Sequence, residues 1–160
     1  MNEKILERLR SFAPESIEGA VEFRGDLTVA IRRDDLVRVA TFLRDDPELG
    51  FDLLKDLSGV DMLRPEARYE VVYTLYSLQT RTYLRLKVCV DEEDLVVPTV
   101  TGVWAGADWH ERETFDMFGI KFSGHPDLRR LYMPEDFEHY PLRKDFPLMG
   151  IPDSLPLPRR

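Results

Sequence analysis

Two apolar runs separated by a short polar turn constrain the fold of this chain more than any other feature. The runs cover residues 69–78 and 83–90, and Gln79-Thr80-Arg81-Thr82 joins them. Runs of this length, rich in valine, leucine and tyrosine, are typical of β-strands, and the short polar connection predicts a hairpin. One face of the second strand carries only apolar side chains, namely Leu84, Leu86, Val88 and Val90, and the other carries Arg85, Lys87 and Cys89.

The first strand of this hairpin is apolar on both faces. Val71, Tyr73 and Leu75 fall on one side of it, and Val72 and Tyr76 fall on the other. An antiparallel sheet that meets water on one face normally alternates apolar and polar residues, so an apolar second face needs a cover. We therefore expect either a helix or another protein to pack on the outer face of this sheet.

The N-terminal part predicts a helix followed by a hairpin. Apolar residues at helical spacing from Ile5 to Phe12 indicate a short amphipathic helix that ends before Pro14. Residues 21–31 alternate apolar and polar side chains on either side of Arg24-Gly25-Asp26, which predicts a hairpin with the glycine in its turn.

A second helix and a further strand follow. Asp34 or Asp35 is expected to cap a helix whose apolar stripe runs over residues 36–43 and which ends at Asp45-Asp46-Pro47. Residues 51–60 are compatible with a strand or a helix, and we favour a strand.

A third helix is predicted from residue 108. Asp108 and Glu111 stand three residues apart, as in a capping box, and Gly119 is placed to end the helix in the left-handed conformation. Trp104 and Trp109 are expected to be core or interface anchors.

Beyond this helix the composition changes abruptly. Residues 123–160 contain seven of the eleven prolines, which excludes long regular elements. This segment balances six basic against six acidic side chains, so residues 1–122 carry the whole net charge of −8. Its aromatic residues make it too adhesive for a linker, and we interpret it as a strap for a partner surface. The predicted fold is α+β: a mostly antiparallel sheet with flanking helices in a domain of residues 1–122, and an extended proline-rich C-terminal docking tail of residues 123–160.

The charge and hydropathy of the chain exclude several classes of protein. A net charge of −8 disfavours nucleic-acid binding, which requires a positive surface. No run of about 18 apolar residues is present, so membrane association has to come through a partner. Residues 1–10 include Glu3 and Glu7 and lack a continuous apolar stretch, which argues against a signal or transit peptide. We expect the protein to stay on the cytoplasmic side of the membrane.

The sequence offers no site for a redox cofactor. Cys89 is the only cysteine, whereas an iron–sulfur cluster needs about four protein ligands. Glycine-rich loops of the kind that bind dinucleotides or ATP are absent. Cys89 is most simply a packed strand residue.

The densest mixture of charged and aromatic residues lies in the third predicted helix. Glu111, Arg112, Glu113 and Asp116 fall within two helical turns, beside Trp109 and two phenylalanines. Some of these charges have to lie against apolar surface, where a charge is tolerated only if it is paired. The pattern indicates a docking element with internal ion pairs.

This region carries a family resemblance. Glu111-Arg112-Glu113, Asp116-Met117-Phe118, His125 and Arg129-Arg130-Leu131-Tyr132, at these spacings, resemble the signature of the 30 kDa (C) subunit family of respiratory complex I, or NADH:quinone oxidoreductase. The likeness covers about residues 98–148 and includes the C-terminal segment around Arg143-Lys144-Asp145. The signature and interface residues that it implies are Glu111, Arg112, Glu113, Asp116, Phe118, Gly119, His125, Pro126, Arg129, Arg130, Leu131, Arg143, Lys144 and Asp145.

The resemblance implies a non-redox structural subunit in the peripheral arm of a proton-translocating enzyme. Electrons would pass from NADH through FMN and iron–sulfur clusters in partner subunits to quinone. The expected partners are the quinone-site (D-like) subunit and adjacent iron–sulfur subunits, and the location is the cell inner membrane, peripherally, on its cytoplasmic side. No catalytic, cofactor-binding or metal-binding residue is expected in this chain.

Other interpretations of the same residues are weaker. His110, Glu113 and Asp116 lack the second histidine of a zinc-protease motif, so a metal site is disfavoured. For His125, fixing a turn by hydrogen bonding is favoured over a role as general base or proton relay.

Three rival functions remain open. Related scaffold subunits occur in membrane-bound nickel–iron hydrogenases and in complexes that oxidise ferredoxin or reduced deazaflavin. A free-standing enzyme that uses His110, Glu113 and His125, and an adaptor outside bioenergetics, are the alternatives from other classes.

Overall fold

The computed structural model describes residues 1–147 and 149. In chain order the elements are α1 (Asn2–Phe12), η1 (Pro14–Ser16), β1 (Ile17–Phe23), β2 (Asp26–Ile31), η2 (Arg33–Asp35), α2 (Leu36–Asp45), β3 (Leu53–Asp61), β4 (Tyr69–Ser77), β5 (Thr82–Val90), η3 (Glu92–Asp94), β6 (Val96–Pro98), α3 (Ala107–Phe118) and β7 (Lys121–Ser123). Both predicted hairpins, the three helices and the favoured strand over residues 51–60 are confirmed.

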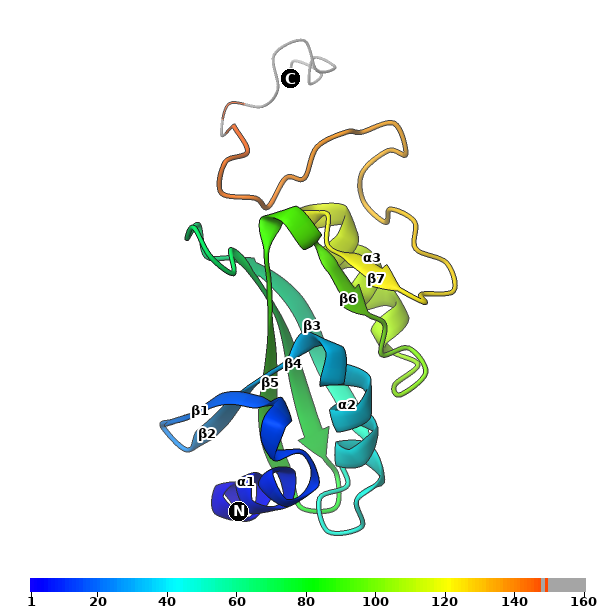
Figure 1. The fold of residues 1–160 in the computed structure, drawn as a ribbon. Helices are drawn as coiled ribbons and strands as arrows, with labels where there is room; N and C mark the ends of the chain where they lie inside the picture. Colours follow the sequence, from blue (N-terminus) through cyan, green and yellow to red (C-terminus); the bar gives the residue numbers. More distant parts are fainter. Residues whose placement is uncertain (148, 150–160) are drawn as a thin grey trace.

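Five strands form the main sheet, in the order β1-β2-β5-β4-β3 (Figure 1). Three of the four neighbouring pairs are antiparallel, and β2 with β5 is parallel. The strands β6 and β7 form a separate parallel pair. The predicted α+β class with a mostly antiparallel sheet is therefore confirmed, while the division of the chain at residue 122 stays a prediction.

The helices pack on one face of the main sheet (Figure 1). The side chains of Val71, Tyr73 and Leu75 on that face of β4 are completely buried. On the opposite face, Val72 and Tyr76 are only half-buried, although the sequence predicted a cover there. Among the described residues no helix supplies it, so a second protein remains the expected cover.

Two predicted helix caps are wrong. Asp35 stands at the N-cap position of α2 without a side-chain capping bond, and its carboxylate pairs with Arg38 one turn along the helix. Asp108 is not the cap of α3: the helix begins at Ala107, after Gly106, and no side chain caps it. Glu111 is directed to another loop instead, as described below.

The C-terminal segment has no helix or strand between residue 124 and residue 147, as the prolines predicted. It runs across the end of the domain that holds α3 (Figure 1). The predicted tail also includes residues 148 and 150–160, which lie outside the described residues. The described part contacts its own domain at several points, so its expected contact with a partner stays a prediction.

Candidate functional site

The helix α3 carries most of the family-like signature, and glycine fixes both its packing and its end. A Cβ at Gly59 of β3 would lie 2.7 Å from the Phe118 ring, so only a glycine lets α3 approach the sheet this closely. The helix ends at Gly119, whose φ of 80° is the left-handed conformation that the sequence predicted.

Glu111 is completely buried without an arginine or lysine partner among the described residues. Its carboxylate accepts hydrogen bonds from the Thr99 hydroxyl at 2.5 Å and from the Val100 backbone N–H at 2.7 Å. Burial, assisted by the nearby Asp108 charge, raises the pKa of Glu111 to about 7. The prediction that buried charges here are ion-paired is therefore wrong for Glu111, which is tolerated because it can hold a proton.

His125 fixes the turn that follows β7. Its Nδ1 accepts a hydrogen bond from the Asp127 backbone N–H at 3.0 Å, and its side chain is completely buried. Its Nε2 lies 3.3 Å from Asp108 Oδ1 and 3.9 Å from Glu111 Oε2. The predicted turn-fixing hydrogen bond is therefore present, and the second ring nitrogen links the turn to α3.

Asp116 anchors the chain beyond this turn. Its buried carboxylate accepts hydrogen bonds from the backbone N–H groups of Leu131, Tyr132 and Met133 at 2.7–3.0 Å. The Arg130 guanidinium donates to the same carboxylate at 2.7 Å. Burial by itself raises the pKa of Asp116, but these four donors outweigh it and leave the pKa below its usual value.

Arg143 holds the next part of the tail. It donates through Nε to the Phe118 carbonyl at 2.7 Å, and its guanidinium lies 4.5 Å from the centre of the Tyr140 ring. Gly119 lies beneath both residues, because a Cβ there would be 2.7 Å from Tyr140 and from Arg143. The glycine that ends α3 therefore also makes room for the tail.

A second anchor joins the tail to Asp61, the last residue of β3, and to Arg68, which directly precedes β4. Asp61 accepts hydrogen bonds from the Arg68 guanidinium at 2.9 Å and from the Lys144 backbone N–H at 2.8 Å. Arg68 also pairs with Glu92 at 2.8 Å and with Asp145 at 3.1 Å. The hydrogen bond from Arg68 is the main cause that lowers the pKa of Asp61 to about 2. The signature residues Lys144 and Asp145 thus hold the tail against the end of β3 and the start of β4.

Three exposed residues, Trp109, Glu113 and Arg129, lie beside the buried Arg112. We call this surface the Trp109 patch and define it as Trp109, Arg112, Glu113 and Arg129. The Arg112 guanidinium lies 4.8 Å from the centre of the Trp109 ring. Its Nε donates to the Arg129 backbone carbonyl at 3.2 Å. Trp109 is 62% exposed, and the Glu113 and Arg129 side chains are exposed as well. Trp109 is therefore a surface residue, whereas Trp104 lies in the core.

The structure separates the histidines that a metal site or an enzyme would combine. His110 lies 3.8 Å from Asp56 of β3, while His125 faces Asp108 and Glu111 on the opposite side of the first turns of α3. Within residues 1–147 and 149, no cluster of His, Cys, Asp and Glu side chains has the geometry of a metal site. Pro126 is exposed and Leu131 is half-buried.

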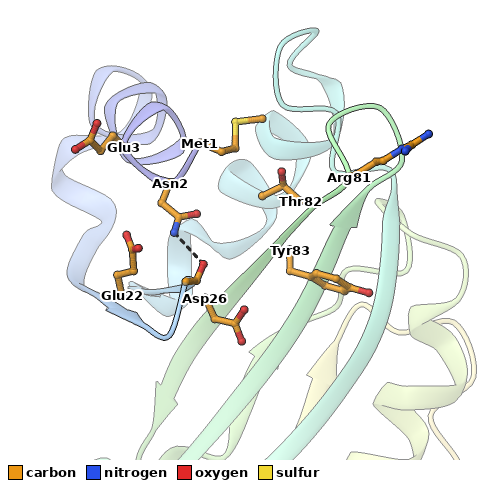
Figure 2. Close-up of a pocket in the computed structure, with 9 residues that line it drawn as sticks. Met1, Asn2, Glu3, Glu22, Asp26, Arg81, Thr82 and Tyr83 are labelled. Atoms are coloured by element: carbon orange, nitrogen blue, oxygen red, sulfur yellow. Dashed lines mark hydrogen bonds between the residues drawn. The ribbon is translucent and has the colours of Figure 1, made fainter.

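The signature residues lie apart from the surface groove that Figure 2 shows. That groove lies between the start of α1, the turn of the β1–β2 hairpin and the β4–β5 turn. Glu3, Glu22, Asp26 and Arg81 are among its lining residues, and Asn2 donates to the Gly25 carbonyl at 3.0 Å across it. The groove therefore adds nothing to the signature site.

The sequence did not predict which residues bind the signature side chains and the tail. Thr99 and Val100 hold Glu111, and Asp61 and Arg68 hold the tail. Thr99 precedes α3 by eight residues and Asp61 lies on β3, so no local spacing pointed to either. The available signal for the second anchor was a pair of opposite charges, Asp61 and Arg68, on either side of the connection between two predicted strands.

Comparisons with known proteins identify the family that this signature marks. The family described as "Respiratory-chain NADH dehydrogenase, 30 Kd subunit" matches residues 29–152. This chain belongs to that family. The 30 kDa family relatives include the C subunit of NADH-quinone oxidoreductase from Roseiflexus sp. (strain RS-1), 58% identical over 92% of this chain and 84% of the relative. The C 2 subunit of the same enzyme from Rhizobium meliloti (strain 1021) is 50% identical over 88% of this chain and 79% of the relative.

Solved structures agree with this assignment to the 30 kDa family. The trypsin-resistant fragment (1–134) of Nqo5 aligns with a TM-score of 0.64 and 35% identity, over 80% of this chain and 100% of the fragment. A chain of the membrane-bound sulfane sulfur reductase, an archaeal respiratory membrane complex, aligns with a TM-score of 0.75 and 28% identity, over 92% and 86%. The family recognised from residues 111–132 is thus confirmed, and this 30 kDa family chain is a subunit of a multisubunit complex I-like assembly. Within its described residues, no helix is long and apolar enough to cross a membrane.

Proposed function

We propose that this chain is the non-redox structural C subunit in the peripheral arm of a proton-translocating NADH:quinone oxidoreductase. It braces the quinone-site subunit and an adjacent iron–sulfur subunit on the cytoplasmic side of the cell inner membrane. Electrons pass from NADH through FMN and iron–sulfur clusters in those partners to quinone. The catalytic chemistry belongs to the partners, and this chain supplies a rigid surface.

The division of labour within the signature carries this proposal. Asp116, Arg130 and Arg143 are used inside the chain, where they fasten residues 130–143 onto α3. In the same region, Trp109, Glu113 and Arg129 of the Trp109 patch are exposed. A tryptophan stacked on an arginine and flanked by charges is the composition of a binding hot spot. Internal anchors that hold a preformed patch reduce the ordering entropy lost on docking.

The charges of this patch are suited to recognition across an interface. Glu113 makes no ion pair within the described residues, and Arg129 pairs only with the exposed Asp127 at 2.9 Å. Both charges are therefore available to a partner of opposite charge without breaking a buried pair. Their removal should affect docking rather than the fold.

Charge reversal tests this proposal directly. The Glu113→Lys and Arg129→Glu variants, tagged and expressed in the native host, should be lost from the complex recovered from detergent-solubilised membranes. Wild-type chain should copurify with flavin and iron–sulfur subunits that oxidise NADH and reduce quinone. The free energy of unfolding of each isolated variant should lie within about 0.5 kcal/mol of the wild-type value, because exposed charges contribute little to stability.

Two variants on α1 serve as matched controls. Glu7→Lys and Arg10→Glu reverse exposed charges far from the Trp109 patch and should leave assembly unchanged. Recovery of both patch variants at normal stoichiometry in an active complex would contradict the docking role. A wild-type chain that copurifies with no flavin or iron–sulfur subunit would contradict the proposal as a whole.

A second candidate is the equivalent scaffold subunit of a relative of this enzyme, such as a membrane-bound nickel–iron hydrogenase or a complex that oxidises ferredoxin or deazaflavin. The observation that favours it is the structural match to a chain of the membrane-bound sulfane sulfur reductase, with a TM-score of 0.75. The same purification separates the two. A nickel–iron subunit, or electron input from ferredoxin in place of NADH, would select this candidate.

A further inference from the structure

The strand β1 forms an open edge of the main sheet. It pairs with β2 alone among the described strands, and six of its seven residues are exposed. After an irregularity between Ile17 and Gly19, its pairing with β2 is regular up to Phe23. Soluble proteins usually protect such an edge with a proline, a lysine or a covering element. β1 contains neither residue, and no described element covers it.

The outer face of this edge is apolar and exposed. Val21 and Phe23 are 65% and 67% exposed. Val21 pairs with Thr28 of β2, which pairs with Arg85 of β5, so these side chains share one face of the sheet. The Arg24 guanidinium lies 5.1 Å from the centre of the Phe23 ring. This is the uncovered face of the sheet, so the two side chains gain nothing from the core of their own domain.

The hairpin is held in place from behind. Arg24 and Gly25 have φ values of 53° and 87°, which fit the tight turn of a two-residue hairpin. The Asn2 side chain of α1 donates to the Gly25 carbonyl at 3.0 Å, as Figure 2 shows. A rigid edge is a good template for a further strand, because little ordering is required when the strand is added.

The charges of β1 specify the sequence pattern of the added strand. Glu18 and Glu22 are its charged residues, and Glu22 lies between the apolar Val21 and Phe23. Glu3 of α1 lines the same groove as Glu22 and adds a second negative charge on that side (Figure 2). An extended partner segment would meet acidic and apolar positions in alternation. Opposite-charge and apolar cross-strand pairs then favour a segment in which basic and apolar residues alternate.

The same charges disfavour a second copy of this chain as the partner. If two β1 strands paired antiparallel about Ala20, Glu18 of each copy would lie opposite Glu22 of the other. Like charges directly opposite each other across a strand pair are destabilising.

We propose that the β1 edge binds an extended segment of a neighbouring protein, with alternating basic and apolar residues, as a sixth strand of the sheet. This inference rests on the proposed scaffold function and adds a second docking surface, separate from the Trp109 patch. Its occupant is a β-strand, whereas the Trp109 patch presents a helix surface.

A peptide pair tests the inference on the full-length chain alone. One eight-residue peptide alternates lysine and valine, and its control alternates glutamate and valine. Addition of the lysine peptide should change the backbone amide NMR chemical shifts of residues 18–23. The affinity of this peptide should be about tenfold above that of the glutamate peptide, since the two differ in two or three cross-strand charge pairs. Equal affinities, or shifts that avoid β1, would overturn the proposal.

The Glu18→Lys/Glu22→Lys double variant provides the matched reversal. It should prefer the glutamate peptide, a gain of binding that misfolding cannot produce. An unchanged preference would overturn the assignment of these glutamates. Concentration-dependent dimerisation through residues 18–23 of the wild-type chain would show that the occupant is a second copy instead.

A crosslink in the assembled complex separates this inference from the proposed function. A photoreactive side chain at position 21 should capture an extended segment of a neighbouring subunit with the alternating basic and apolar pattern. A complex that contains flavin and iron–sulfur subunits but yields no crosslink at position 21 would overturn the β1 proposal and leave the scaffold function intact. Absence of those subunits would overturn the scaffold function instead.

Discussion

The Arg130 guanidinium donates a hydrogen bond to the Asp116 carboxylate over 2.7 Å, and the Asp116 side chain is completely buried. Three backbone N–H groups of residues 131–133 point at the same carboxylate. One carboxylate of α3 therefore accepts the backbone hydrogen bonds of a stretch of chain that has no strand or helix of its own. A proline-rich segment acquires a fixed path because a buried charge replaces the missing backbone partners.

The Asp116→Asn variant should release this part of the tail. The amide removes the negative charge opposite Arg130 and replaces one acceptor oxygen with a donor. Loss of one partner of a buried ion pair costs about 3 kcal/mol. We expect a decrease of that order in the free energy of unfolding by urea, with faster amide hydrogen exchange at residues 131–133.

The control for this variant is Asp127→Asn. Asp127 pairs with Arg129, but both side chains are more than half exposed, at 55% and 64%. Such a pair contributes less than about 1 kcal/mol, so stability and exchange at residues 131–133 should stay near wild type. Equal losses in the two variants would show that Asp116 has no special anchoring role.

The sequence predicted that α3 holds buried charges in internal pairs, but it did not predict which groups pair. Asp116 pairs with Arg130 inside the chain, whereas the sequence had marked Arg130 as an interface residue. Glu111 was assigned to a capping box by its spacing from Asp108. In the folded chain, Thr99 and Val100 of the preceding loop donate to the Glu111 carboxylate, and this contact between separate elements replaces the capping bond that the local pattern predicted.

Glu111 should make stability depend on pH near neutrality. Folding raises its pKa from 4.5 to about 7 because the site is desolvated. The folded state therefore binds this proton more tightly than the unfolded state. The stabilisation is complete below pH 4.5 and is lost as the pH rises to about 7, for a total of about 3 kcal/mol. Unfolding by urea at a series of pH values from about 5 to about 8 measures this slope.

The Glu111→Gln variant should flatten that slope. Glutamine mimics the protonated acid, keeps an acceptor for the Val100 N–H and can pair with the Thr99 hydroxyl. We expect it to be at least as stable as wild type at about pH 8 and to lack the decrease that wild type shows up to about pH 7. Glu113→Gln, two residues further along α3 and on its exposed side, should leave the slope as in wild type. A wild-type profile that is already flat would contradict the buried, protonated state.

Asp61 should make the stability decrease as the pH falls into the acid range, the opposite of the pH dependence expected for Glu111. Its folded pKa of about 2 lies below the usual 3.8, chiefly because Arg68 donates to it. Its stabilisation, about 2 kcal/mol, is present above about pH 4 and is lost as the pH falls toward about 2. The Asp61→Asn variant should lose this amount at about pH 6 and lie closer to wild type at about pH 2.5. A constant difference between the two proteins over this range would show that the Arg68 contact is not electrostatic.

The outer face of the sheet shows both the strength and the limit of prediction from sequence. Alternation of apolar and polar residues indicated which side of β5 is buried. The apolar Val72 and Tyr76 predicted a cover for the other face, which no described helix supplies, and a second protein there stays a prediction. The exposed edge at Val21 and Phe23 was predicted only as a hairpin strand, because periodicity does not say which strand ends a sheet.

Gly119 is the position where one added methyl group should be most harmful. Its φ of 80° costs an L-residue about 1 kcal/mol, and a Cβ there would lie 2.7 Å from both Tyr140 and Arg143. Relief of the contact requires the tail to move away from Phe118, whose carbonyl accepts from Arg143. We expect Gly119→Ala to lower the free energy of unfolding by about 2–3 kcal/mol. Gly102→Ala is the control, because a Cβ at Gly102 meets no atom within 4 Å. If the two variants lose the same stability, the close approach of the tail to α3 does not exist in solution, whereas a selective loss at Gly119, with faster amide exchange at residues 142 and 143, places the tail against the helix end.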